Sequence, residues 1–174
     1  HIISSENVLS GNMLIGIESS GPHSNGFSLI RKILNNYQGP EDIKHDIITK
    51  VLTPTTLYPK LILNILKKYK INSLSHITGG GLIENLPRSI PNYLSVEIDS
   101  QSWQIPEVFK WLKNEGNILQ NDMYRIFNCG IGMVLIVNEK DVKDILNEIS
   151  SNKLNGYLIG RVKDKNQKES VIFK

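Results

Sequence analysis

Residues 19–28, with the sequence SSGPHSNGFS, are the densest group of residues in the chain that could bind an anion. Gly21 and Gly26 have the spacing of a phosphate-binding P-loop, but Phe27 replaces the lysine of that motif, so this is not a Walker A sequence. A glycine-rich helix N-terminus still offers unpaired N–H groups and a partial positive charge. The residues that we predict to bind a phosphate here are Ser20, Gly21, Ser24, Asn25 and Gly26.

His23 lies inside this stretch and adds a donor that is either neutral or charged. A simpler interpretation is that Ser24 or Asn25 only caps a helix, while the glycines only form a turn. The run SSGPHSNG holds more polar chemistry than one cap requires, which favours binding.

A second glycine-rich stretch runs from Thr78 through Gly79, Gly80 and Gly81. A glycine in a regular element costs roughly 0.5 to 1 kcal/mol relative to alanine, so three in a row indicate tight backbone geometry or contact with a ligand. We expect His76, just before them, to be a partly buried strand residue rather than a catalyst.

The third candidate is Asn128-Cys129-Gly130, at a predicted turn where binding residues often gather. Asn128 is predicted to bind substrate. No base is identifiable for Cys129, so we interpret it as a packed thiol rather than a nucleophile. No metal site is predicted, because the histidines are isolated, no CxxC motif exists and the acidic residues do not cluster.

Mixed strand and helix patterns must position these stretches. They predict strands at 13–17, up to Ile77, 93–98, 132–137, 157–162 and 170–173, and helices at 27–37, 107–115 and 141–149. A short helix after Gly81 should end at Pro87 or Pro91, Gly116 should take the C′ position after Glu115, and Asn121 should cap a short turn.

One further helix is predicted after Thr53-Pro54, with Thr53 as its cap and an apolar face of Leu57, Leu61, Ile65, Leu66 and Tyr69. Pro59 would remove a hydrogen bond from such a helix, which allows a later start near Tyr58. The predicted fold class is α/β, in a layered α+β arrangement with a single mixed β-sheet packed with helices. No linker divides the chain, so we expect one domain.

Composition excludes several classes of protein. The chain has 174 residues, 40% of them hydrophobic, and its single cysteine fits a reducing compartment. A net charge of +3 is scattered and interleaved with acidic residues, so no nucleic-acid footprint is predicted. No apolar run is long enough for a membrane span, and we expect a soluble, cytoplasmic protein. Because the chain begins with His1, we also expect an N-terminal part to be missing.

Five blocks of sequence carry a resemblance to one known family. They are LIGIESSGPHSNGFSLIRKIL, LTPTTLYPKLIL, HITGGGLIENLPRSIP, SWQIPEVFKWL and MYRIFNCGIGMVLIV, in this order. From about Val8 to its end, the chain resembles the C-terminal half of aminoimidazole ribonucleotide synthetase, also called phosphoribosylformylglycinamidine cyclo-ligase. Phe27 and Pro59 depart from the pattern, since tyrosine and an aliphatic residue are expected there.

The resemblance implies an ATP- and magnesium-dependent ligase of purine biosynthesis. Such enzymes close formylglycinamidine ribonucleotide into aminoimidazole ribonucleotide and release ADP and phosphate. It also implies two α/β domains, of which the absent N-terminal one forms a homodimer and supplies the magnesium ligands and much of the ATP site. This chain would then be inactive alone, with nucleotide substrates and the N-terminal domain as its partners.

On this resemblance, Ser20 to Gly26 bind a phosphate of ATP or substrate, His23 polarises a group or transfers a proton, and Thr78 to Gly81 shape the same pocket. A non-catalytic anion-binding module acting as a partner or regulatory subunit is the alternative. Another ATP-using superfamily member, such as a selenophosphate, thiamine phosphate or hydrogenase-maturation enzyme, is a third. The SGPHSNG and FNCGIGM blocks argue against that third option.

Overall fold

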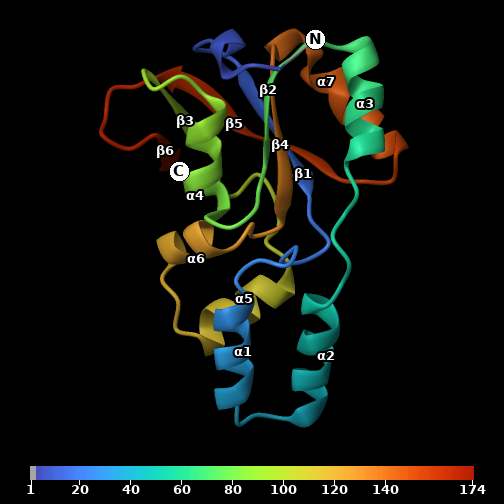
Figure 1. Cartoon of the computed structure of the whole chain (residues 1–174), viewed down its shortest axis with the longest axis vertical. Coiled ribbons are helices and arrows are strands. Elements are labelled where there is room, and N and C mark those ends of the chain that lie inside the picture. The colour runs from blue at the N-terminus through green and yellow to red at the C-terminus, as the bar shows by residue number, and fades with distance from the viewer. Residues whose placement is uncertain (1–2) are drawn as a thin grey trace.

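A six-stranded mixed sheet in the order β2-β4-β1-β5-β3-β6 forms the centre of the computed structural model, which describes residues 3–174 (Figure 1). The strands are β1 (Met13–Glu18), β2 (Ile71–His76), β3 (Leu94–Ile98), β4 (Ile131–Val137), β5 (Gly156–Asp164) and β6 (Val171–Phe173). All neighbours pair antiparallel except β3 and β6, which are parallel. The predicted mixed α/β sheet is therefore confirmed.

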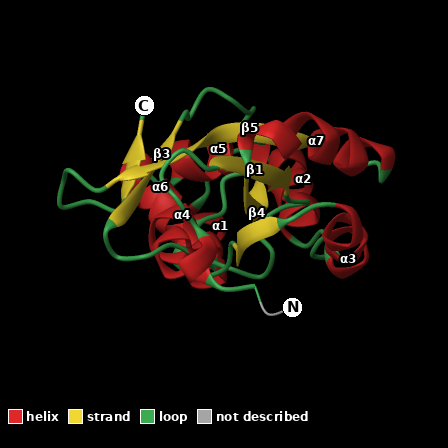
Figure 2. Ribbon diagram, turned by 90° about the horizontal axis from the view of Figure 1, so that it is seen from above, coloured by secondary structure: helices red, strands yellow, loops and turns green. Residues whose placement is uncertain are grey.

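The helices are α1 (Phe27–Asn36), α2 (Glu41–Val51), α3 (Pro59–Lys68), α4 (Gly81–Asn85), α5 (Glu107–Glu115), α6 (Gln120–Ile126) and α7 (Val142–Ser151). Short 3-10 turns lie at Ser5–Asn7, Leu86–Ser89 and Glu139–Asp141. Figure 1 shows α1, α2 and α5 together beyond one end of the sheet. Figure 2 shows α3 and α7 on one side of the molecule, opposite β3 and the C-terminal end.

The sheet is buried on both faces at its centre because its strands alternate side chains between two hydrophobic clusters. In β4, Val134 and Ile136 belong to the larger cluster, while Met133, Leu135 and Val137 belong to the cluster under α3 and α7. All seven residues of β4 are buried. Fully apolar, doubly buried strands give the strongest sequence signal, and the strand predicted at 132–137 is confirmed.

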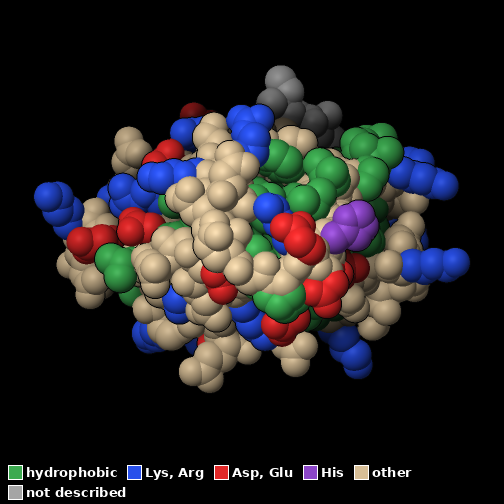
Figure 3. Space-filling view, turned by 90° about the horizontal axis from the view of Figure 1, so that it is seen from below, with side chains coloured by type: hydrophobic (Ala, Val, Ile, Leu, Met, Phe, Trp, Pro, Cys, Tyr) green, Lys and Arg blue, Asp and Glu red, His purple; other side chains and the backbone are tan. Residues whose placement is uncertain are grey.

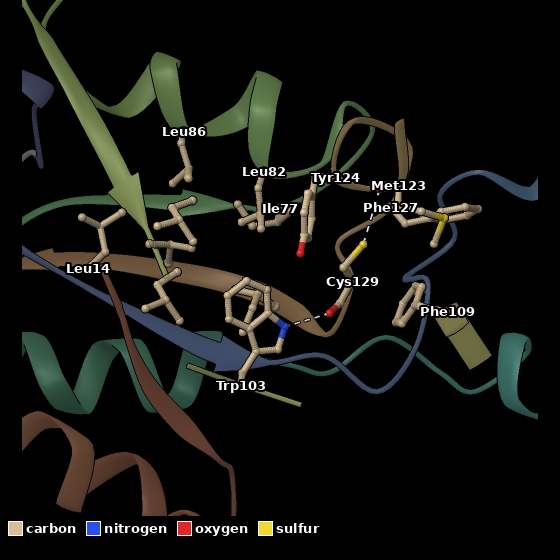
Figure 4. Packing of buried hydrophobic residues seen from close by; sticks show 14 of the residues in the cluster. Leu14, Ile77, Leu82, Leu86, Trp103, Phe109, Met123, Tyr124, Phe127 and Cys129 are labelled. Atoms are coloured by element: carbon tan, nitrogen blue, oxygen red, sulfur yellow. Dashed lines mark hydrogen bonds between the residues drawn. The ribbon is translucent and has the colours of Figure 1, made fainter. Parts of the chain in front are cut away.

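Figure 4 shows the part of the larger cluster that surrounds Cys129. The Trp103 indole N–H donates to the Cys129 carbonyl at 3.0 Å, and the Cys129 thiol contacts the Met123 carbonyl oxygen at 3.4 Å. Burial raises the pKa of the Cys129 thiol to about 12. Cys129 is thus a packed thiol, as predicted.

Two predictions about the middle of the chain are corrected. Helix α2 was not predicted, although Pro40 at its start and Glu41 and Asp42 in its first turn are helix-start signals. Thr53 caps no helix: residues 53–57, here called the strap, are non-helical, and α3 begins only at Pro59. The later start near Tyr58 is confirmed, and Leu57 in the strap is 84% exposed.

Two predicted helix ends also differ. Gly116 keeps a right-handed conformation after α5, and Asn117, with φ of 48°, is the left-handed residue. A Cβ atom at Gly116 would lie 2.7 Å from Ile33 Cδ1, so packing rather than backbone conformation requires this glycine. Helix α6 begins at Gln120, so Asn121 is not its cap. Within residues 3–174 no helix combines the length and apolar character of a membrane span.

Candidate functional site

All three stretches singled out in the sequence meet at one end of the sheet. They are residues 19–26 between β1 and α1, here called the His23 loop; residues 78–81 after β2, the triple-glycine loop; and residues 128–130 before β4. The antiparallel strand β4 lies between β1 and β2, which brings its start beside their ends. Figure 1 shows this junction between the sheet and the group formed by α1, α2 and α5.

The His23 loop has an unusual backbone. His23 and Ser24 both lie in the left-handed region, with φ of 52° and 61°, and Gly26 follows with φ of 72°. Left-handed conformations at non-glycine residues cost on the order of 1–3 kcal/mol each and concentrate at functional sites. A side chain at Gly26 would overlap the Phe127 ring, so only glycine fits there.

This backbone leaves several N–H groups free at the start of α1. Within residues 3–174, the amides of Ser24, Gly26 and Phe27 donate to no acceptor, and no side chain caps the helix. The Asn25 amide donates to the Pro22 carbonyl at 3.1 Å, so it is already used. Ser24 is exposed. Free amides at the positive end of a helix fit a phosphate group.

His23 fastens the His23 loop to the strap. Its Nε2 accepts from the Ser20 amide at 3.1 Å and the Thr56 amide at 3.3 Å, and the Ser20 hydroxyl donates to the Pro54 carbonyl at 2.7 Å. Because Nε2 is an acceptor, the proton of the neutral ring belongs on Nδ1. Nδ1 is buried and, among the described residues, has no hydrogen-bond partner.

Burial first, and then the charge of His76, lowers the pKa of His23 to about 4. The ring is therefore neutral at pH 7, and only 6% of the residue is exposed. His23 holds two loops together in this structure. Its predicted role in proton transfer would require Nδ1 to become accessible.

In the triple-glycine loop the protein itself bonds the backbone carbonyls, whereas within residues 3–174 the amides of Gly79 and Gly80 donate to no acceptor. The Gly81 amide donates to the Thr78 carbonyl at 3.1 Å. The buried Asn85 side chain donates to the carbonyls of Thr78, Gly79 and Gly81 at 3.4, 3.1 and 2.7 Å. A Cβ atom at Gly81 would overlap the Tyr124 carbonyl. This loop packs against α6, and a Cβ atom at Gly79 would lie 3.6 Å from Asn25 Oδ1 in the His23 loop.

Asn128 is also bonded within the fold, and its contact with substrate stays a prediction. It is 1% exposed, and its Nδ2 donates to the Gly21 carbonyl at 2.8 Å. Its Oδ1 accepts from the Ser19 hydroxyl and the Gly130 amide, each at 2.9 Å. Asn128 therefore supports the start of the His23 loop from below.

Sequence reasoning missed Tyr58 and Asn85 as parts of this junction. Tyr58 is 3% exposed, and its ring lies between those of His23 and His76, with both centroid distances 6.1 Å. His76 is at the end of β2, as predicted, but it is exposed. Tyr58 contacts loops that are distant along the chain, and Asn85 donates to backbone carbonyls. Neither contact leaves a local sequence motif.

The surface near the junction is open. Figure 3 views the molecule from the end that carries α1, α2 and α5 and shows hydrophobic side chains at the surface beside acidic ones. Leu52, just before the strap, and Leu57, its last residue, are 64% and 84% exposed. Three surface cavities, of about 220, 580 and 700 Å³, are lined by residues outside the His23 loop. Within residues 3–174 no three His, Cys, Asp or Glu side chains group as metal ligands.

Curated relatives match almost the whole chain. The phosphoribosylformylglycinamidine cyclo-ligase of Geotalea daltonii is 44% identical over 167 residues, which is 92% of this chain and 48% of that protein. The enzyme of the same name from Trichlorobacter lovleyi is 45% identical and covers 99% of this chain and 52% of its own. The chain thus spans about half the length of the curated relatives it matches.

Solved structures share the fold at low identity. HypE of E. coli has a TM-score of 0.69 at 16% identity and covers 98% of this chain and 48% of its own. AaThiL, in complex with AMPPCP and TMP, has a TM-score of 0.61 at 16% identity over 96% of this chain and 48% of its own. Residues 10–173 match the family model described as AIR synthase related protein, C-terminal domain. With this match over nearly its full length, the chain belongs to that family.

Proposed function

We propose that this chain is the C-terminal half of a phosphoribosylformylglycinamidine cyclo-ligase of the cytoplasm. It would convert formylglycinamidine ribonucleotide to aminoimidazole ribonucleotide with release of ADP and phosphate. The observation that carries the proposal is the identity of 44–45% to enzymes of that name across 92–99% of the chain. The free amides at the start of α1 are the groups of the chain that would contact the ligand.

We propose that the amides of Ser24, Gly26 and Phe27 hold a phosphate group of ATP or substrate. Three donors at a helix N-terminus match the oxygens of a phosphate and need no lysine. AMPPCP, an ATP analogue, is bound by the structural neighbour AaThiL, which supports a nucleotide as the ligand class. The ATP would supply the phosphoryl group that activates the substrate oxygen.

A missing N-terminal half completes the proposed enzyme and, in the full-length protein, its homodimer. Relatives are about twice as long as this chain, and the exposed Leu52 and Leu57 lie beside the junction. The described residues hold no acidic cluster that fits magnesium. We therefore assign the magnesium ligands to the missing half.

Co-expression with the N-terminal half of the Geotalea daltonii relative tests the proposal. Aminoimidazole ribonucleotide should form from substrate, ATP and magnesium with both halves present, and not with this chain alone. A non-catalytic module would give no product in either case, and turnover by the chain alone would refute the division of the site.

The phosphate contact is tested by Ser24→Asp, with Ser24→Asn as the matched neutral control. An added carboxylate would repel a phosphate at the α1 N-terminus while favouring the helix dipole, so binding falls without loss of fold. Product formation should drop at least about fivefold for Ser24→Asp only, as two unit charges 4 Å apart interact by about 1 kcal/mol or more. Equal activity of the two variants would show that no phosphate binds beside Ser24. A crystal grown in sulfate should show an anion against Ser24 to Gly26.

A further inference from the structure

The strand pair β1–β4 contains a bulge at the end that faces the His23 loop. Ile17 pairs with Met133 and Glu18 with Ile131, so Gly132 is an extra residue on β4. A bulge disrupts the ladder and often lies next to a functional site. Here the space above Gly132 is filled by two rings. A Cβ atom at Gly132 would overlap the Tyr58 hydroxyl and lie 2.8 Å from His23 Cε1.

A hydrogen bond of its hydroxyl and the packing of its ring hold Tyr58 in this space. Its hydroxyl donates to the Glu18 carbonyl at 2.7 Å, at the residue where the β1–β4 register shifts. Its ring packs between His23, at an interplanar angle of 57°, and His76, at 70°.

We propose that Tyr58, seated on the bulge at Gly132, is the positioning residue that fixes the orientation of His23 and so keeps the amides at the start of α1 directed to a phosphate. The chain of contacts runs from the Glu18 carbonyl through the phenol to the imidazole. It continues from Nε2 to the amides of Ser20 and Thr56. This inference rests on the proposed function only for the identity of the phosphate ligand.

The main test uses Tyr58→Phe, which removes the hydroxyl and keeps the ring, with Tyr69→Phe as the matched control at the far end of α3. In the unaltered chain, ¹⁵N NMR of the His23 ring should show a single neutral tautomer with the proton on Nδ1. In Tyr58→Phe the ring should exchange between orientations and show averaged nitrogen shifts. Tyr69→Phe should leave the ring unchanged.

The His23 titration gives a second readout that a general loss of stability would not move. The titratable groups packed against the ring are Tyr58 and His76, and Glu18 lies beyond the phenol. The pKa of His23 should rise from about 4 toward its ordinary 6.5 in Tyr58→Phe, because water then reaches the imidazole. An unchanged tautomer and midpoint in this variant would overturn the proposal.

Binding of inorganic phosphate tests the positioning role of Tyr58 separately from the proposed activity. The half-saturating phosphate concentration should rise about fivefold in Tyr58→Phe, the usual effect of one lost hydrogen bond. Gly132→Ala should give the same changes by displacing the phenol from its other side. If the imidazole is released but the two halves of the enzyme never make product, the proposed activity fails and the positioning role stands. If phosphate binding is unchanged while the imidazole is released, the positioning role is refuted.

Discussion

The His23 loop and the triple-glycine loop have the same outline, a strand followed by glycines and a helix, but they differ in what contacts their backbone. In the His23 loop the glycines and two left-handed residues leave amides unpaired at the start of a ten-residue helix. In the triple-glycine loop the glycines allow close packing against α6, and Asn85 occupies the carbonyls. Glycine-rich turns therefore indicate close approach, and only the partner decides whether a ligand or the protein makes it.

The largest effect expected from this difference is on stability at Gly81. Gly81→Ala would place a methyl group on the Tyr124 carbonyl at a φ of 55°, which costs about 3 kcal/mol of unfolding free energy or more. Gly79→Ala, in the same triplet, meets only an ordinary contact and should change stability by less than about 0.5 kcal/mol. Urea unfolding measures both. Similar losses at the two positions would contradict the packing role.

A second difference is that only the His23 loop contains a titratable side chain. The unfolded chain takes up a proton on His23 near pH 6.5, whereas the folded chain does so only near pH 4. Unfolding free energy should therefore rise by about 3 kcal/mol as pH increases from 4 to 6.5, then level off. Unfolding of His23→Gln should lack this contribution, and His45→Gln on α2 should retain it. Identical pH profiles for the two variants would show that His23 is not buried as described.

The two asparagines that support these loops should differ in what they affect. Asn85→Ala and Asn128→Ala each leave buried groups unpaired and should cost about 2 kcal/mol of unfolding free energy. Asn128 supports the His23 loop through Gly21, so only Asn128→Ala should also weaken phosphate binding. Isothermal titration with phosphate measures the binding affinity of both variants. An equal loss of affinity in Asn85→Ala would show that both loops belong to one phosphate site.

The smallest expected effect compares two histidines. His23→Ala removes the acceptor that joins the Ser20 and Thr56 amides, so phosphate or a nucleotide analogue should bind about fivefold more weakly. His76→Ala removes an exposed ring and should change affinity less than twofold. Both affinities follow from a binding titration. Matching losses would mean that His23 has no special place in the loop.

The sequence predicted the fold best where burial is uniform. Strand β4 and helix α5 were predicted because each carries a complete apolar pattern within itself. Helix α2 was not predicted because its buried residues are only Ile47 and Val51, which makes its apolar pattern weak. The strap was predicted to be helical because the exposed Leu57 was counted in an apolar face. Pro59 allowed the later start of α3 to be predicted as an option, and the structure confirms it.

For the candidate site, the sequence predicted the place better than the roles. Residues 19–26, 78–81 and 128–130 were all singled out, and the structure brings them to one end of the sheet. The roles of Asn128 and Gly81 depend on contacts with residues distant along the chain, such as Gly21 and Tyr124. Such contacts leave no local pattern, and for the same reason Tyr58 escaped notice.

Cys129 has a practical consequence for following these loops. It is the single cysteine of the chain, and its thiol is sealed in the core with a pKa near 12. Thiolate is the reactive form, so maleimide dyes should not react with the folded protein at neutral pH. A cysteine introduced at an exposed position would carry a fluorophore without background. Reaction of Cys129 itself would report global opening of the core.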